Sequence, residues 1–100
     1  MARSRLELQE LLEEFCPNVY FQPTTNTKMV YPAIIFTRDF AENLFADNEP
    51  YHRMKRYMVK VIDRDPDSVI PDKVAELPMC SYNRFYTAGD LNHDVFTLFF

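Results

Sequence analysis

Three segments of this chain have the composition of β-strands that are apolar on both faces. They span residues 31–38, 57–62 and 95–100. Successive side chains of a strand point to opposite faces of its sheet, so Phe96 and Leu98 share one face while Val95 lies on the other. Strands of this kind need cover on both faces of the sheet. The chain is therefore expected to build a sheet on which helices pack.

The N-terminal segment has the pattern of an amphipathic helix. Ser4 and Glu7 have the spacing of a capping box, which satisfies backbone N–H groups of the first helical turn. Apolar residues then repeat at helical spacing, namely Leu8, Leu11, Leu12 and Phe15. Residues 4–15 are predicted to form a helix with one buried stripe, which stops at "CPN".

The stretch "DPDSVIPDKVAELP" predicts a second helix. Asp67 or Ser68 is the expected N-cap. Pro71 fits the first turn, where a backbone N–H is not needed, and Pro78 ends the helix. The apolar side consists of Ile70, Val74 and Leu77.

The remaining segments predict strands, turns and one ambiguous stretch. The strands are expected at 19–22, 29–39, 51–63, 80–87 and 93–100. The early part of 51–63 mixes charged residues, so this part is expected to project beyond the core. Residues 40–50 lack clean periodicity and indicate either a long hairpin connection or a partly helical excursion. A turn through residues 88–90 joins the last two strands.

The succession of elements is α-β-β-β-α-β-β, which favours the α+β class. We expect a mostly antiparallel sheet of about five strands, flanked by two helices. The first helix is expected to cover one face of the sheet and the second helix only part of the other. The length of 100 residues predicts a single domain spanning residues 1–100.

Composition excludes several functional classes. The only glycine is Gly89, whereas a glycine-rich phosphate loop needs several residues without a Cβ, so nucleotide chemistry is not expected. No apolar run approaches the roughly 20 residues of a membrane-spanning helix, and no signal peptide is evident. Cys16 and Cys80 are therefore expected to be reduced thiols in a protein made in the cytoplasm.

His93 and Asp94 invite a catalytic interpretation. A hydrolase would need a carboxylate that orients the histidine, but neighbours on a strand point to opposite faces. Asp90 could reach back from the turn, yet no nucleophile is suggested by the sequence. We favour a structural role in which Asn92, His93 and Asp94 satisfy backbone groups where the last strand starts, and this strand is expected at an edge of the sheet. No catalytic residue is predicted.

Metal sites are also not predicted. Zinc ligands would have to come from Cys16, Cys80, His52 and His93, which occur singly and without paired spacing. Aspartates at positions 63, 65 and 67 faintly resemble a calcium loop, but the glycine and the closing glutamate of such a loop are missing. We expect neither a metal nor a cofactor.

Basic residues occur at positions 52–56 and are flanked by Tyr51 and Tyr57. Cations meet phosphates and aromatic rings stack on bases, so nucleic-acid binding is one interpretation. The formal charge of the chain is -4, whereas a dedicated nucleic-acid binder normally carries a basic excess. A solvated strand or a charged subunit interface is the better interpretation.

The sequence as a whole resembles a family of tailed-bacteriophage proteins known as tail terminator, tail completion or head–tail joining proteins. The resemblance rests on "RSRLELQELLEE", on "NVYFQP" followed by "MVYPAIIF", on "RYMVKVIDRDPDS" with "IPDKVAELP" behind it, and on "DLNHDVFTLFF". It covers nearly the entire chain in order. None of these pieces is a catalytic fingerprint, so the resemblance implies a structural protein without enzymatic activity.

The family implies a ring, commonly a hexamer, made of copies of this chain. Such a ring caps the tail tube protein, stops its polymerisation and offers a docking surface to the head-completion or connector protein. Genomic DNA would pass through it without sequence-specific binding. The resemblance thus implies a virion protein of the neck or tail that is assembled in the host bacterial cytoplasm. A head-closure adaptor ring and a small nucleic-acid-binding protein are the alternatives.

A surplus of apolar surface supports an oligomer, because six Tyr and nine Phe are hard to hide in one small chain. We expect contacts between subunits, or with the tube, in the strand 51–63, the stretch 40–50 and the aromatic C-terminal end. The predicted contact residues are Phe45, Tyr51, Arg53, Lys55, Arg56, Phe99 and Phe100.

Overall fold

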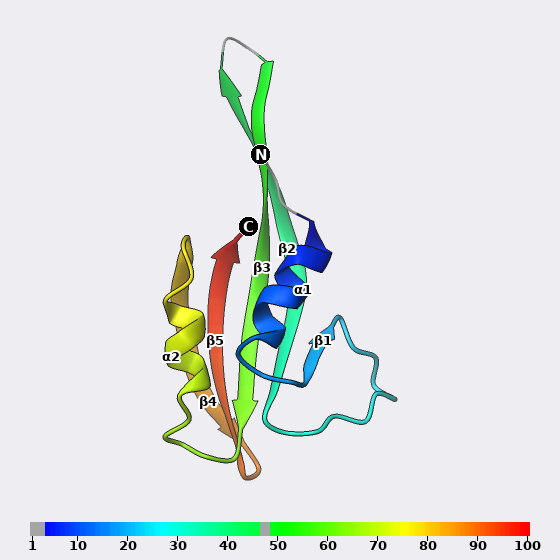
Figure 1. The fold of residues 1–100 in the computed structure, drawn as a ribbon, viewed down its shortest axis with the longest axis vertical. Coiled ribbons are helices and arrows are strands. Elements are labelled where there is room, and N and C mark those ends of the chain that lie inside the picture. The colour runs from blue at the N-terminus through cyan, green and yellow to red at the C-terminus, as the bar shows by residue number, and fades with distance from the viewer. Residues whose placement is uncertain (1–3, 47–48) are drawn as a thin grey trace.

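The computed structural model consists of a five-stranded sheet with two helices packed on it (Figure 1). It describes residues 4–46 and 49–100, and the side chains of residues 4–38 and 55–100. The elements are α1 (Arg5–Glu13), β1 (Val19–Phe21), β2 (Ala33–Ala46), β3 (Glu49–Asp63), α2 (Ile70–Ala75), β4 (Cys80–Ala88) and β5 (Leu91–Phe99). This succession confirms the predicted order and the α+β class.

The strands lie in the order β1-β2-β3-β5-β4. β1 runs parallel to β2 and the other neighbours are antiparallel, which confirms the mostly antiparallel sheet. The expectation that the last strand lies at an edge is wrong, because β5 lies between β3 and β4. The tight turn at Gly89, whose φ is 64°, only makes β4 a neighbour of β5 on one side. β3 pairs along the other side.

Helix α1 begins as predicted. The backbone N–H of Glu7 donates to Ser4 Oγ at 3.2 Å, and Leu8 and Leu12 are fully buried. The helix ends at Glu13, two residues earlier than predicted. The N–H groups of Phe15 and Cys16 both donate to the carbonyl of Leu12, so the chain tightens into a turn at this point.

Helix α2 is shorter than predicted, and neither Asp67 nor Ser68 occupies the N-cap, which is Val69. The reason is local hydrogen bonding before the helix. The N–H of Asp67 donates to Asp65 Oδ1 at 2.9 Å, which holds this stretch in a turn. Ser68 Oγ accepts from the N–H of Ile70 at 3.3 Å and so still satisfies one N–H at the helix start. The prediction for Pro71 in the first turn is confirmed.

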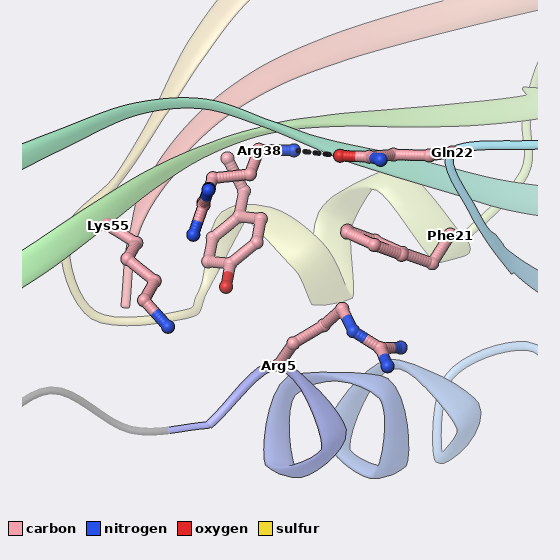
Figure 2. Close-up of a pocket in the computed structure, with 6 residues that line it drawn as sticks. Arg5, Phe21, Gln22, Arg38 and Lys55 are labelled. Carbon is pink, nitrogen blue, oxygen red and sulfur yellow. Dashed lines mark hydrogen bonds between the residues drawn. The ribbon is translucent and has the colours of Figure 1, made fainter.

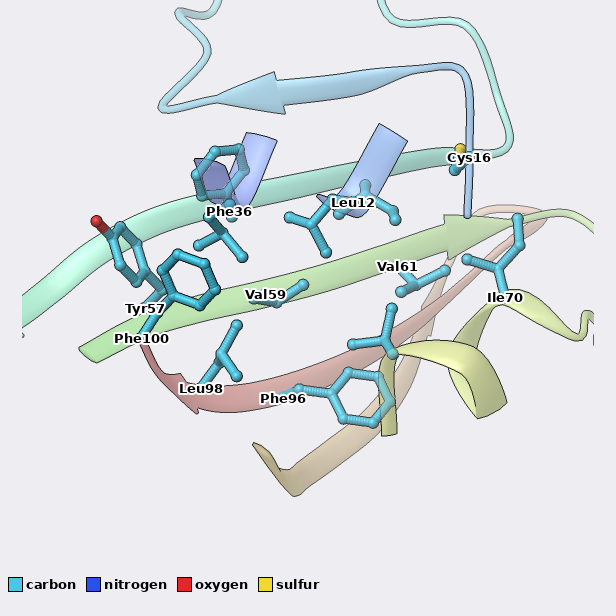
Figure 3. Packing of buried hydrophobic residues seen from close by; sticks show 13 residues of the cluster. Leu12, Cys16, Phe36, Tyr57, Val59, Val61, Ile70, Phe96, Leu98 and Phe100 are labelled. Carbon is cyan, nitrogen blue, oxygen red and sulfur yellow. The ribbon is translucent and has the colours of Figure 1, made fainter. Parts of the chain in front are cut away.

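Both helices cover the same face of the sheet (Figures 1 and 3). The expectation that the second helix covers the opposite face is therefore wrong. The buried side chains of this helix-covered face come from α1, α2 and the three central strands, and they include Leu8, Leu12, Ile34, Phe36, Tyr57, Val59, Val61, Ile70, Val74, Phe96, Leu98 and Phe100. Neither α1 nor α2 covers the other face, which we call the open face. Two rows that cross the open face are Ile35–Lys60–Val95–Arg84 and Thr37–Met58–Thr97–Ser81.

Strands β2 and β3 run far beyond the rest of the sheet (Figure 1). The last pair between β3 and β5 is Arg56 with Phe99, whereas β2 and β3 continue to pair with each other as far as Ala46 and Glu49. The molecule measures 51 × 26 × 22 Å as a result. We call residues 40–46 and 49–55 the arm. The predicted projection of the early part of 51–63 is confirmed, and the stretch 40–46 extends a hairpin strand rather than forming a helix.

Candidate interaction surfaces

His93 is a packed side chain on the open face. It is only 9% exposed, and its ring stacks on Tyr86 with the centroids 4.6 Å apart and the planes 11° apart. Burial lowers the pKa of His93 below its ordinary value, with the nearby Lys60 acting in the same direction. Its Nδ1 atom has no hydrogen-bond partner among the described residues. A neutral, stacked imidazole fits a packing role.

The neighbouring polar groups have other partners. Asp94 accepts a hydrogen bond from the hydroxyl of Tyr82 at 2.9 Å, and Asp90 pairs with Arg64 at 3.2 Å. The side-chain amide of Asn92 donates to the carbonyls of Asp63 and Arg64. The structural interpretation of this segment is confirmed for Asn92. Neither carboxylate orients His93.

The two cysteines are free thiols in different elements. Cys16 is buried, and its thiol lies 3.3 Å from the carbonyl oxygen of Pro32. Cys80 is half-buried at the start of β4. Burial raises the pKa of both thiols, which keeps them protonated and slow to react. Among the side chains of residues 4–38 and 55–100, no group of three His, Cys, Asp or Glu residues lies together in a way that could hold a metal ion.

The predicted contact residues gather at one end of the molecule. Phe45, Tyr51 and Arg53 belong to the arm strands, and their side chains lie outside the described residues. Lys55 and Arg56 lie where the arm joins the sheet. Phe99 is half-buried and faces Arg56 across the sheet.

Phe100 differs from the other predicted contacts. Its side chain is 8% exposed and belongs to the core on the helix-covered face, and its backbone N–H donates to the carbonyl of Lys55 at 2.9 Å. The structure therefore places Phe100 inside the chain rather than on a contact surface. A strand whose two faces are both apolar gives no sequence signal for which face is covered within the chain.

A pocket that the sequence did not predict lies at the base of the arm. It has a volume of about 320 Å³ and is lined by Arg5, Phe21, Gln22, Arg38, Lys55 and Tyr57. Figure 2 shows Arg38 and Lys55 on neighbouring strands, facing the N-terminal turn of α1 from which Arg5 projects. The pocket thus combines side chains from α1, the end of β1, β2 and β3. We call it the basic pocket.

Positive charge dominates the basic pocket, because three of the six described residues that line it are cations and none of these six is acidic. The guanidinium of Arg5 lies 4.5 Å from the ring centroid of Phe21, a cation–π contact that restrains the side chain. Burial raises the pKa of Tyr57, and the charges of Arg38 and Arg5 offset only part of this effect. The tyrosine hydroxyl therefore stays protonated and can donate to an anion.

Backbone strain marks the rim of the basic pocket. Gln22 has a φ of 46°, which side chains other than glycine rarely adopt. Its N–H donates to the carbonyl of Phe36 at 3.0 Å, and its Oε1 accepts from the N–H of Arg38 at 3.4 Å. These contacts fix Gln22 where β1 ends.

An oxyanion such as a carboxylate or a phosphate is the chemical group that the three cations and the protonated hydroxyl of the basic pocket can bind.

Strand β4 is an open edge with exposed aromatic side chains. Tyr82 is 56% exposed and Phe85 is 51% exposed, and Met79 just before the strand is 60% exposed. A free edge with large apolar side chains is a ready site for association. The arm, the basic pocket at its base and this edge are therefore three candidate surfaces, of which the first two share Lys55.

Comparisons with known proteins assign none of these surfaces. The part of the chain that the structure describes contains no helix with the length and apolar character to cross a membrane. A scan against protein-family models, a search of curated proteins and a search of solved structures find no match to this chain.

Proposed function

We propose that this chain is a structural subunit of the phage neck, a tail terminator or tail completion protein. In this role its copies form a ring, commonly a hexamer, that caps the tail tube and provides the surface on which the head-completion or connector protein docks. Genomic DNA passes through the ring without sequence-specific contacts. The resemblance along nearly the whole sequence suggested this role, and the arm is the observation that supports it most.

The arm is a hairpin that a chain acting alone would stabilise only weakly. Two-stranded hairpins are marginally stable in water, and they gain stability from a third strand or from a packed apolar face. Beyond Arg56 the strands β2 and β3 pair with each other and with no other described strand. The arm sequence nevertheless contains the apolar residues Phe40, Leu44, Phe45, Tyr51 and Met54. In the proposed assembly, a neighbouring subunit or the tail tube pairs with these two strands or packs against them.

The edge strand β4 supports an assembly as well. Its exposed side chains Tyr82 and Phe85 lie at the edge of the sheet opposite to the edge formed by β1. An arm and an edge are different surfaces, and contacts between two different surfaces generate rings when the rotation closes. A ring-forming subunit needs this arrangement, whereas a monomeric enzyme does not.

The proposal is tested by comparing the full chain with a version that lacks the arm. Residues 42–54 are replaced by Asn-Gly, a two-residue turn that joins the paired residues Ala41 and Lys55. Native mass spectrometry gives the oligomeric state, and co-sedimentation with purified tail tubes gives tube binding. The full chain should assemble, alone or on tubes, and the shortened chain should fold but remain free. A full chain that is monomeric and never binds tubes would contradict the proposal. Because the tube can act as a template, a monomer in isolation does not.

The basic pocket favours a second candidate, DNA binding in a head-closure or nucleic-acid-binding protein. Arg5 and Arg38 join Lys55 there and enlarge the basic stretch found in the sequence. If phosphates bind in the pocket, affinity for DNA should fall with rising salt, and Arg38→Ala with Lys55→Ala should reduce both the affinity and the salt dependence. Fluorescence anisotropy with a labelled duplex at several salt concentrations measures both.

A further inference from the structure

We propose that the basic pocket receives the acidic loop of residues 63–67 from a second copy of the chain. This contact rests on the proposed ring and specifies how neighbouring subunits recognise one another. One subunit contributes Arg5, Arg38 and Lys55, and the next subunit contributes Asp65 and Asp67. The result is a head-to-tail contact between opposite charges.

The acidic loop presents exposed carboxylates. Arg64 is the only cation within residues 63–67, and it is engaged by Asp90 at 3.2 Å. Asp65 and Asp67 are exposed. A loop in which most charges are acidic and the one cation is already paired is complementary to a pocket lined by three cations.

Local hydrogen bonds give the loop a fixed shape. The N–H of Asp65 donates to Asp63 Oδ1 at 3.0 Å, and the N–H of Asp67 donates to Asp65 Oδ1 at 2.9 Å. The N–H of Ser68 also donates to the carbonyl of Asp65 at 3.3 Å. Consecutive turns of this kind reduce the conformational entropy that the loop would lose on binding. On the other side of the contact, Arg5 is already restrained by Phe21.

The pocket of one chain cannot bind the loop of the same chain. Figure 1 shows the arm at the top and the connection between β3 and α2 at the bottom. Lys55 and Asp63 lie on the same strand, and eight steps of extended chain at roughly 3.3 Å each separate them by about 26 Å. The contact must therefore join two molecules. Such a contact can close reciprocally in a two-fold dimer or run head to tail around a ring, and the proposed ring uses the second arrangement.

A carboxylate loop fits the pocket better than DNA does. Guanidinium groups bind carboxylates and phosphates alike through paired, charge-assisted hydrogen bonds, so the preference rests on the net charge of the chain. The chain carries a formal charge of -4, which disfavours its approach to a polyanion. The acidic loop carries part of this charge on the side of the molecule away from the pocket, where it can meet the next subunit.

A charge swap tests the contact. The pocket variant carries Arg38→Glu and Lys55→Glu, and the loop variant carries Asp65→Lys and Asp67→Lys. In each variant alone the pocket and the loop have the same sign, so self-association should weaken by at least about tenfold. In an equimolar mixture the acidic pocket meets the basic loop and the basic pocket meets the acidic loop. The mixture should therefore regain assembly, in complexes with a 1:1 composition by native mass spectrometry.

Matched controls carry the same charge changes at exposed positions away from both sites. Lys28→Glu with Lys73→Glu controls for the pocket variant, and Glu10→Lys with Glu14→Lys controls for the loop variant. Both controls should assemble like the unmodified chain. Far-ultraviolet circular dichroism and thermal unfolding verify that each variant is folded. A zero-length carbodiimide cross-link between Lys55 and Asp65 or Asp67 in the unmodified protein tests the contact without any substitution.

The outcomes separate this inference from the proposed function. Assembly that survives both charge reversals, or a mixture that stays unassembled, overturns the head-to-tail contact. Neither result contradicts the proposed ring, which other surfaces could form. A pocket variant that loses DNA binding but not self-association also overturns it, in favour of a phosphate ligand. An unmodified chain that never associates, with or without tubes, removes both the ring and the contact.

Discussion

Replacing Phe96 by alanine tests the core on which every surface of this molecule depends. Phe96 is 1% exposed in β5, pairs with Val59 of β3 and meets Tyr82 edge to face with centroids 5.2 Å apart. Substituting a buried phenylalanine by alanine costs about 3–5 kcal/mol, because transfer energy is lost and a cavity remains. The aromatic pair accounts for about 0.5–1.5 kcal/mol. We therefore expect a loss of about 4 kcal/mol in the free energy of unfolding.

Phe85 is the matched control, since it is the same residue type on the adjacent strand β4 but is 51% exposed. About half of the burial energy of a phenylalanine is at stake there, so Phe85→Ala should cost about 1 kcal/mol. Urea unfolding followed by circular dichroism measures both. With an m-value of about 2 kcal/mol/M, the midpoint should fall by about 2 M for Phe96→Ala and by about 0.5 M for Phe85→Ala. Equal losses would refute the assignment of Phe96 to the buried core.

Three further predictions concern single sites. The pKa of His93 is lowered in the folded protein, so the unfolded chain binds more protons and stability should fall as pH drops from 7.5 through the ordinary value of 6.5. In His93→Gln the urea midpoint should depend less on pH between 7.5 and 5.5. A pH dependence equal to that of the unmodified protein would contradict this. Gly89→Ala should cost about 1 kcal/mol by thermal unfolding, since φ is 64° and an added Cβ would meet no atom within 4 Å; a loss above 3 kcal/mol would indicate a steric clash instead. A thiol reagent should label the half-buried Cys80 before the fully buried Cys16 in the native protein, as peptide mass mapping would reveal, and the reverse order would contradict their burial.

Local sequence signals predicted much of this fold. Ser4 and Glu7 determine where α1 starts, and the alternation of Phe96 and Leu98 with Val95 determines which side chains share a face of β5. Such signals act over a few residues and depend on backbone geometry alone. The position of β5 between β3 and β4 depends instead on pairing between distant segments, and the sequence carried no comparable signal for it.

The features with functional interest were the hardest to predict. The strand residues 40–46 lack clean periodicity, so the strand pairing with β3 that the structure shows had no sequence signal. The basic pocket joins Arg5, Arg38 and Lys55, which are far apart in the sequence and converge only in the folded chain. Lys55 alone belonged to the basic stretch that the sequence singled out.

Electron microscopy of tail tubes mixed with the purified protein tests the proposed neck function most directly. The proposal predicts a closed ring at one end of each tube, with the arms in contact with a neighbouring subunit or with the tube. Tubes incubated with the chain that lacks residues 42–54 should have bare ends. Tube ends that stay bare with the full chain, while the folded protein remains free in solution, would contradict the proposal.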